Sequence, residues 1–238
     1  MGDTIFSPLY KALLARGVKF KFFHKIDRLS LSDDKTQIDQ IDLTRQVEMT
    51  DGPYDPFVRV KDLDCWPSEP LWDQLKDGDA LCKAGVDFES AWSANPSATT
   101  LPSLKRGVDF DDVVLGISIA AIPPLAEELI AARTDWQTMV EKVKTTRTLG
   151  AQLWLKKSPE ELGWGGGASI LTGYAGELDT WADMTDLHVY EDWPQDAYPN
   201  NIAYFCGPLE DPEEEPPTTD QDYPARMQQV VRDTTEAW

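Results

Sequence analysis

The sequence predicts a mixed α/β fold, and three local patterns indicate it. Apolar and basic residues alternate from Val18 to Phe22, which is the period of a half-buried strand. A continuous apolar run over residues 110–117 is typical of a strand buried on both faces, as in parallel sheets. Apolar residues at helical spacing follow Pro8 and Thr134. With 238 residues, of which 41% are hydrophobic, the chain can form a packed core.

The first element that the pattern predicts is a short helix over residues 8–16. Ser7 and Pro8 are suited to its start, and Gly17 stands where such a helix would stop. The alternating strand follows at once, and the turn residues 32–35 come after it. Residues 36–47 then predict a second strand that returns beside the first. We therefore expect a β-hairpin after the opening helix.

Prolines interrupt the middle of the chain. Six of them fall within residues 51–106, so we expect an irregular insertion with short helices at 70–76 and 87–93. Regular structure resumes at the apolar run 110–117. Pro123 and Pro124 then open a helix that continues through Arg133.

The remaining chain alternates predicted helices and strands. A helix begins at Thr134, and the strands that we expect after it lie at 152–155, 168–174 and 201–206. Residues 210–222 have the composition of an acidic, proline-rich linker. A final helix is expected over residues 224–236.

The charge excludes two classes of partner. Lys and Arg total 22 against 42 Asp and Glu, giving a net charge of -20 that repels nucleic acids and anionic membrane surfaces. No run of about 18 apolar residues is present to span a bilayer, and the start has no secretory signal. Three widely spaced cysteines, Cys65, Cys82 and Cys206, indicate reduced and mostly buried thiols. We expect a soluble cytoplasmic protein.

No catalytic residue can be assigned from the sequence. The only histidines, His24 and His188, stand outside any recognisable signature, and a structural or surface role is the leading interpretation of both. Scattered carboxylates and two isolated histidines do not predict a metal site. Gly165-Gly166-Gly167 is not followed by the Lys-Ser or Lys-Thr of a phosphate loop, so a flexible turn is the better interpretation.

One comparison goes beyond composition. The order of helix, Gly17, strand and the corner residues Ile26 and Leu29 resembles the flavin-containing amine oxidase and phytoene desaturase superfamily. Further segments resemble a bacterial branch of FAD- and NAD(P)-binding oxidoreductases: Cys65-Trp66-Pro67-Ser68-Glu69-Pro70-Leu71, Phe110 to Ser118, Gln152-Leu153-Trp154-Leu155, and Asp179 to Met184. The resemblance covers most of residues 4–209.

The resemblance implies where a cofactor and a substrate would bind. Ile26 would offer its backbone to the adenine of FAD, although an ordinary core isoleucine is the alternative. Leu115, Gly116 and Ile117 would pass near the flavin, with a bend in a buried strand as the alternative. The implied substrate-pocket residues are aromatic, and core packing is their alternative role: Trp66, Trp154, Tyr174 and Trp181.

The resemblance also implies a domain division. Its parts are a partial flavin-domain helix and hairpin at 1–50, an irregular insertion at 51–106, a return strand of the flavin domain at 107–123, a substrate-domain-like region at 124–209, and a linker with a C-terminal helix at 210–238. The G-x-G-x-x-G segment that anchors FAD in this superfamily does not occur in the sequence. The chain thus resembles the interior of such an enzyme: a truncated product, a sequence fragment, or a split subunit.

Two functions of different classes follow. The first is a part of a FAD-dependent oxidoreductase that supplies the substrate side of the site, with a partner chain supplying the dinucleotide-binding fold and the isolated chain retaining no FAD. The second is a non-catalytic, acidic binding or interaction module. An independent hydrolase that uses His24 or His188 is a third and weaker alternative.

Overall fold

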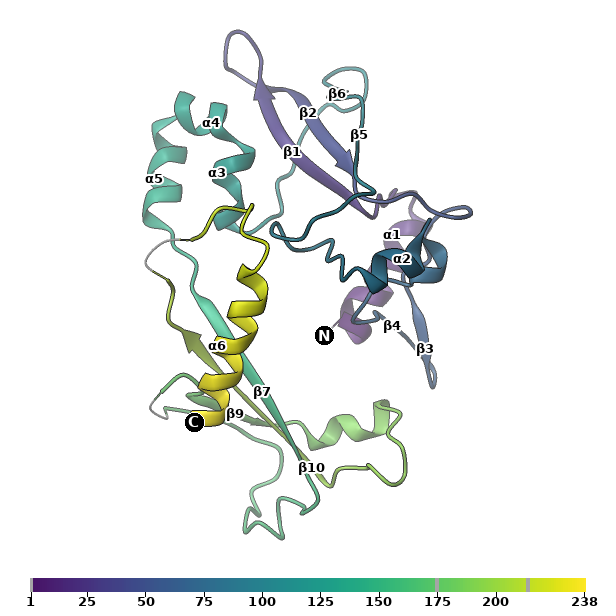
Figure 1. Cartoon of the computed structure of the whole chain (residues 1–238), viewed down its shortest axis with the longest axis vertical. Helices are drawn as coiled ribbons and strands as arrows, with labels where there is room; N and C mark the ends of the chain where they lie inside the picture. The colour runs from purple at the N-terminus through teal and green to yellow at the C-terminus, as the bar shows by residue number, and fades with distance from the viewer. Residues whose placement is uncertain (1, 174–175, 213–214) are drawn as a thin grey trace. The chain divides into compact units, whose positions relative to one another are not determined.

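The structure is a computed structural model that describes residues 2–173, 176–212 and 215–238. The chain forms two compact units (Figure 1). Unit 1 comprises Met1–Gly17, Pro56–Glu69 and Thr146–Trp238, and unit 2 comprises Val18–Asp55 and Pro70–Thr145. All strand ladders in the described residues are antiparallel. The expected mixed α/β class is confirmed.

Unit 2 is built on a β-hairpin. Its strands are β1 (His24–Leu31) and β2 (Ile38–Arg45), with the short β5 (Thr99–Thr100) and β6 (Leu104–Lys105) both paired to β2. The predicted turn at residues 32–35 joins β1 to β2. Asp34 accepts hydrogen bonds from the hydroxyls of Ser32 and Thr36 there, and these bonds lower its pKa. Lys35 takes a left-handed φ of 58° to close the turn.

Helices complete two small cores in unit 2. The helices α3 (Ile122–Leu125), α4 (Glu127–Ala132) and α5 (Thr134–Lys142) gather beside β1, as Figure 1 shows. Leu29 of β1 is buried against Ile122, Leu125 and Ala126. The second core consists of Val47, Leu75, Leu81 and Val86. Val47 follows β2, and the other three lie in or beside the 3-10 helix Trp72–Gln74 and α2 (Gly78–Lys83).

Two predicted strands are wrong. Residues 18–23 are not in a sheet, because Phe23 turns the backbone at φ 55° and strand pairing begins only at His24. Residues 111–117 are irregular, and Phe110 makes only an isolated bridge. In that run Leu115 packs on the core while Val114 is 96% exposed. The apolar run therefore supplies one core side chain instead of a strand buried on both faces.

Smaller corrections concern helices and cysteines. Residues 87–93 form turns in place of a helix, and only residues 72–74 of the expected 70–76 are helical. All three cysteines are free, but Cys82 is exposed on α2 and the other two are half-buried, so the prediction of mostly buried thiols is wrong. The short helix α2 has only one buried large side chain, Leu81, which leaves Cys82 facing outward.

Unit 1 opens with the predicted N-terminal helix. A π-helical turn, Gly2–Phe6, leads into α1 (Ser7–Ala15), with Pro8 in its first turn. The small hairpin of β3 (Val58–Val60) and β4 (Leu63–Cys65) lies against it. Lys11 forms an ion pair with Asp64, and Asp3 accepts a hydrogen bond from the backbone N–H of Trp66 at 2.8 Å.

The main sheet of unit 1 has the order β7-β10-β9-β8. Its strands are β7 (Arg147–Leu155), β8 (Ile170–Thr172), β9 (Thr180–Asp183) and β10 (Asn201–Leu209). The 3-10 helix Thr185–Tyr190 precedes β10, and α6 (Tyr223–Ala237) follows it. These strands and this final helix confirm the predicted elements at 152–155, 201–206 and 224–236. Within the predicted strand 168–174, residues 170–172 form β8, and residue 174 lies outside the described residues.

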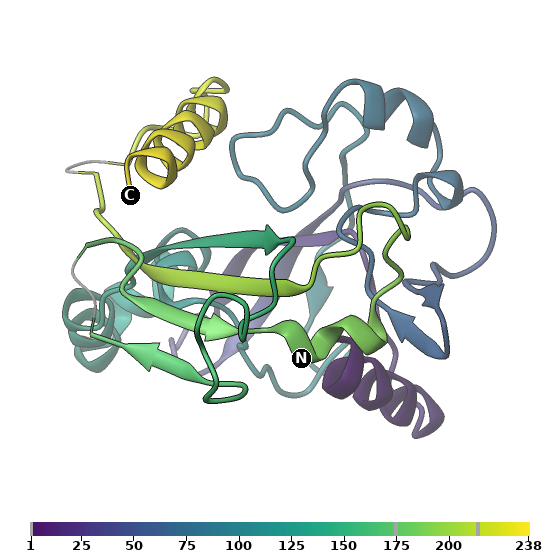
Figure 2. The same ribbon diagram turned by 90° about the horizontal axis from the view of Figure 1, so that it is seen from below.

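Helix α6 covers one half of one sheet face, as Figure 2 shows from below. Met227 of α6 packs on a core of Leu149, Leu178 and Leu209. Arg147 fixes the start of the helix by donating to the Tyr223 hydroxyl. These contacts fix the position of α6 at one end of the sheet.

None of the helices in the described residues is long and apolar enough to cross a membrane.

Candidate functional site

An open pocket of about 440 Å³ occupies the other half of the same sheet face. Its floor consists of transverse rows of directly paired residues, because alternate side chains of a strand point to the same face. Phe205 of β10 pairs with Trp181 of β9, which pairs with Leu171 of β8. In the next rows Ala203 pairs with Leu153, and Asn201 with Leu155.

The loop after β7 builds the walls of the pocket. Pro159, Leu162 and Trp164 line it from this loop. Ser158 and Glu161 form a reciprocal capping box, in which each backbone N–H donates to the other residue's side chain, at 2.9 Å and 3.3 Å. The indole N–H of Trp164 donates to the Gly167 carbonyl at 2.9 Å. These bonds fix the loop locally and hold Trp164 edge-on to Trp181, with ring centroids 5.8 Å apart.

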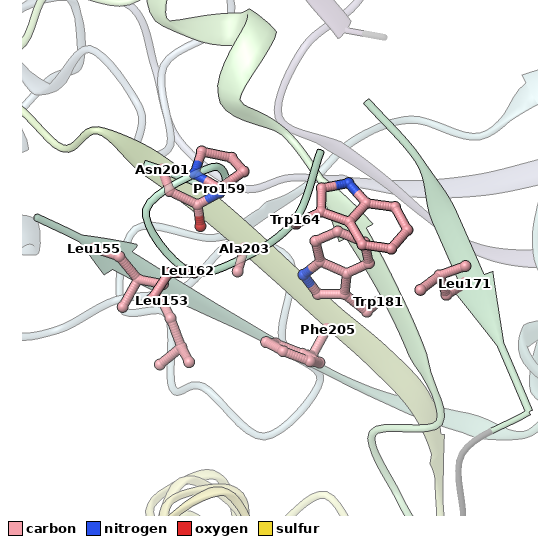
Figure 3. A pocket seen from close by; sticks show the side chains of 10 residues that line it. All are labelled: Leu153, Leu155, Pro159, Leu162, Trp164, Leu171, Trp181, Asn201, Ala203 and Phe205. Carbon is pink, nitrogen blue, oxygen red and sulfur yellow. The ribbon is translucent and has the colours of Figure 1, made fainter. Parts of the chain in front are cut away.

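The two ends of the pocket differ in chemistry. Figure 3 shows leucines and Pro159 at one end, the two tryptophans with Phe205 and Leu171 at the other, and Ala203 between them. Leu153 and Leu162 are 46% and 54% exposed, although they are large apolar side chains. A concave, mostly apolar lining of this kind is typical of small-molecule sites.

Among the described residues that line the pocket, none supplies an acid, a base or a charge. None of the ten lining side chains is titratable, and Asn201 is the only one with a side-chain amide. Tyr204, the nearest phenol along β10, belongs to the opposite face of the strand. Burial, together with the neighbouring Cys206, raises the pKa of the Tyr204 hydroxyl. The arrangement is thus suited to binding and not to proton transfer.

Of the three predicted pocket aromatics that the structure describes, one lines this pocket. Trp181 lines it, whereas Trp154 alternates with Leu153 and Leu155 and so faces the opposite side, where its ring meets Trp193. Trp66 lies after β4 in an aromatic cluster with Tyr10 and Phe57. Tyr174 lies outside the described residues.

The residues predicted to contact FAD lie in unit 2. Ile26 is in β1, where it pairs with Leu43 of the hairpin, and its side chain is exposed. Leu115, Gly116 and Ile117 lie in the irregular segment before α3. A Cβ on Gly116 would meet no atom within 4 Å, so this position has room for a side chain. Their part in FAD binding stays a prediction.

The two histidines have different surroundings. His24 begins β1, with Nδ1 2.6 Å from the Phe22 carbonyl oxygen. His188 is buried in the 3-10 helix before β10, with its ring against Tyr198. Across the described ranges, no group of three or more His, Cys, Asp or Glu side chains is arranged to hold a metal ion.

Sequence reasoning missed nine of the ten pocket residues. The strands at 152–155 and 201–206 were predicted, and the alternation Leu153-Trp154-Leu155 in the first was the signal that could have identified a shared face. Asn201, Ala203 and Phe205 alternate in the same way. Comparisons with protein-family models, with curated proteins and with solved structures found no match for this chain.

Proposed function

We propose that this chain is a binding module that holds a neutral, apolar small molecule in the sheet pocket of unit 1. The observation that carries the proposal is the half-covered sheet face. Helix α6 buries the rows around Leu149 and Leu209, and the open pocket lies over the row of Ala203 and Leu153, where Leu153 is 46% exposed. Apolar side chains gain free energy when a ligand removes them from water. The three free cysteines support placing this binding in a reducing cytoplasm.

A titration with a neutral fluorescent probe tests this function. Phenyl-naphthylamine should bind with saturable, one-to-one stoichiometry and quench tryptophan emission, because Trp164 and Trp181 line the pocket. Phe205→Ala would remove one aromatic side of the pocket and should weaken binding, whereas Trp154→Ala, on the opposite face of β7, should leave the affinity unchanged. Absence of saturable binding in the natural chain would disprove the proposal.

A second candidate follows from the resemblance to flavin-containing oxidoreductases. In this hypothesis the pocket is the substrate side of an active site, the fold of the whole enzyme is a FAD-binding domain with an inserted substrate domain, and a partner chain brings the flavin. The observation that favours it is Trp181, since the resemblance assigned this residue to the substrate side and it lines the pocket.

The described residues offer no anchor for FAD. No parallel strand, glycine turn and helix stand together in them to cradle a pyrophosphate. The isolated chain from a flavin-rich host should therefore be colourless. Co-expression with a neighbouring reading frame that encodes G-x-G-x-x-G should yield a yellow complex whose flavin spectrum responds to a pocket ligand. If no flavin complex forms, only the binding module remains.

A further inference from the structure

Asn201 is the one side chain among the ten lining the pocket that carries a hydrogen-bond acceptor, and hydrogen bonds fix its surroundings. It stands at the start of β10 and is only 3% exposed. Its amide nitrogen Nδ2 donates to Oγ1 of Thr185 at 3.2 Å. The rest of the hydrogen-bond network around Thr185 decides what Asn201 can offer a ligand.

The Thr185 hydroxyl can form no further hydrogen bond. Its hydrogen is directed to Oδ1 of Asp183 at 2.5 Å, and that oxygen also accepts the backbone N–H of Thr185 at 3.0 Å. Oγ1 of Thr185 in turn accepts from the backbone N–H of Ile202 at 3.3 Å and from Asn201. A hydroxyl has one hydrogen and two lone pairs, so all three are used. Reversing the Asn201 amide would place two acceptors against each other.

This network leaves the carbonyl oxygen of Asn201 for the pocket. Within the described part of the chain no donor reaches Oδ1, and the atom is not among those sealed from solvent. Figure 3 shows the amide oxygen of Asn201 pointing among the lining side chains. A ligand that covers this oxygen without donating to it would leave a buried acceptor unsatisfied, which opposes binding. The site therefore discriminates between ligands by a hydrogen-bond donor.

The volume and the aromatic end define the rest of the ligand. A dry cavity of about 150 Å³ accepts one benzene ring. The pocket of about 440 Å³ thus suits a molecule of two or three fused rings. Trp164 and Trp181 meet at an interplanar angle of 81°, which offers a planar ring both a face and an edge. No lining side chain is charged, so a charged ring system would lose its hydration without compensation.

The geometry points to a specific ligand class, an inference that rests on the binding function proposed above: a neutral, planar, fused-ring molecule with one N–H or O–H that donates to Oδ1 of Asn201. Carbazole and fluorene form a matched pair of probes, because they share the three-ring shape and differ by N–H against CH₂. Fluorene is the more apolar of the two, so apolar burial alone would favour it.

Equilibrium dialysis of both probes against the full chain tests the inference. Carbazole should bind about tenfold more tightly than fluorene, the difference expected for one satisfied hydrogen bond against an unsatisfied buried acceptor. Equal affinities, or tighter binding of fluorene, would overturn the ligand class and leave the binding function standing. If neither probe binds, the proposed function itself fails, and the inference fails with it.

Substitutions at Thr185 separate the network from the pocket shape. Thr185→Val removes the hydroxyl that orients Asn201, so the preference for carbazole should fall toward unity. Thr185→Ser keeps the hydroxyl and should keep the preference, and Thr172→Val on the exposed strand β8 is a surface control. If Thr185→Val does not fold, the probe pair on the natural chain still decides. A preference unchanged in folded Thr185→Val would refute the role of the network.

Discussion

Ala203→Leu and Ala151→Leu make the same chemical change at two places on one sheet face. Ala203 lies on the floor of the open pocket, while Ala151 packs against the core beneath α6. Ala203 of β10 pairs with Leu153, and Ala151 of β7 pairs with Phe205, so both alanine side chains point to the same face of the sheet. The pair therefore compares a residue on the pocket floor, only 5% exposed but beside the open pocket, with a residue packed on the α6 core, on the same face of the sheet.

The expected free energies of unfolding differ in sign. At position 203 the three added carbons enter the pocket, and burial of about 0.8 kcal/mol per carbon gives at most about 2.4 kcal/mol of stabilisation. The loss of leucine rotamer freedom reduces this by about 0.5–1 kcal/mol. The net result is a change of about 0 to 2 kcal/mol in favour of the folded state. At position 151 the added carbons overpack the core, which costs about 1–3 kcal/mol.

Urea unfolding and probe binding together test this prediction. Ala203→Leu should keep or raise the stability and weaken phenyl-naphthylamine binding by tenfold or more. Ala151→Leu should unfold at lower urea, and the fraction that stays folded should bind the probe with nearly natural affinity. If Ala203→Leu destabilises the chain as much as Ala151→Leu does, the space over Ala203 is closed in solution and the pocket does not exist.

Three further predictions test how the pocket, the sheet and the hairpin are held. Ser158→Ala removes a hydrogen bond of the capping box, so it should destabilise the loop after β7 by about 1 kcal/mol and weaken probe binding several-fold. Ser158→Thr keeps the hydroxyl and should have neither effect. Equal probe affinities for the natural chain and both variants would contradict the role of the capping box. Gly207→Ala should destabilise the chain by about 1–3 kcal/mol or more, because its Cβ would lie 2.0 Å from the Glu177 carbonyl oxygen, while Gly165→Ala meets no atom within 4 Å and should be neutral in thermal unfolding. Hydrogen bonds from Ser103 and Gln40 lower the pKa of Asp42, so this group stabilises the folded state above about pH 4 and loses that effect as the pH falls through its lowered folded pKa. Ser103→Ala should therefore differ most from the natural chain at neutral pH, and a stability difference that stays constant down to about pH 2 would argue against this assignment.

The sequence was informative where a pattern repeated on consecutive elements. The turn at residues 32–35 and the returning strand at 36–47 were predictable, because turn chemistry and period-two alternation agree there. Residues 18–22 have the same alternation, yet no partner strand pairs with them. Alternation describes a pleated, half-buried surface and carries no information on the hydrogen-bond partner. The left-handed backbone at Phe23, which moves the strand start to His24, has no sequence signal, since phenylalanine rarely adopts it.

The apolar run at 110–117 failed for a different reason. Continuous apolar residues predict burial, but they do not say how many of the side chains a short segment can bury. Here α3, α4 and α5 pack with Leu29 of β1, and the segment contributes only Leu115 to that core. The pocket residues were hidden because they come from four strands and a loop. The pairing of Phe205 with Trp181, and of Trp181 with Leu171, brings three of these residues into one row.

The open half of the sheet follows from how its neighbours are fixed. Arg147 holds the start of α6 through Tyr223 and pairs with Asp211, so the helix cannot slide along β7 without breaking these contacts. The loop after β7 is held by its own capping box and by the hydrogen bond from Trp164 to the Gly167 carbonyl. Between these two fixed elements lies an apolar floor with one oriented amide, Asn201, whose oxygen has no donor among the described residues. Packing alone would favour an apolar residue at this position, because such a residue needs no hydrogen bonds to hold it. Thr185 and Asp183 form hydrogen bonds that orient the Asn201 oxygen toward the pocket. A ligand that donates a hydrogen bond to this oxygen would explain why these residues are arranged in this way.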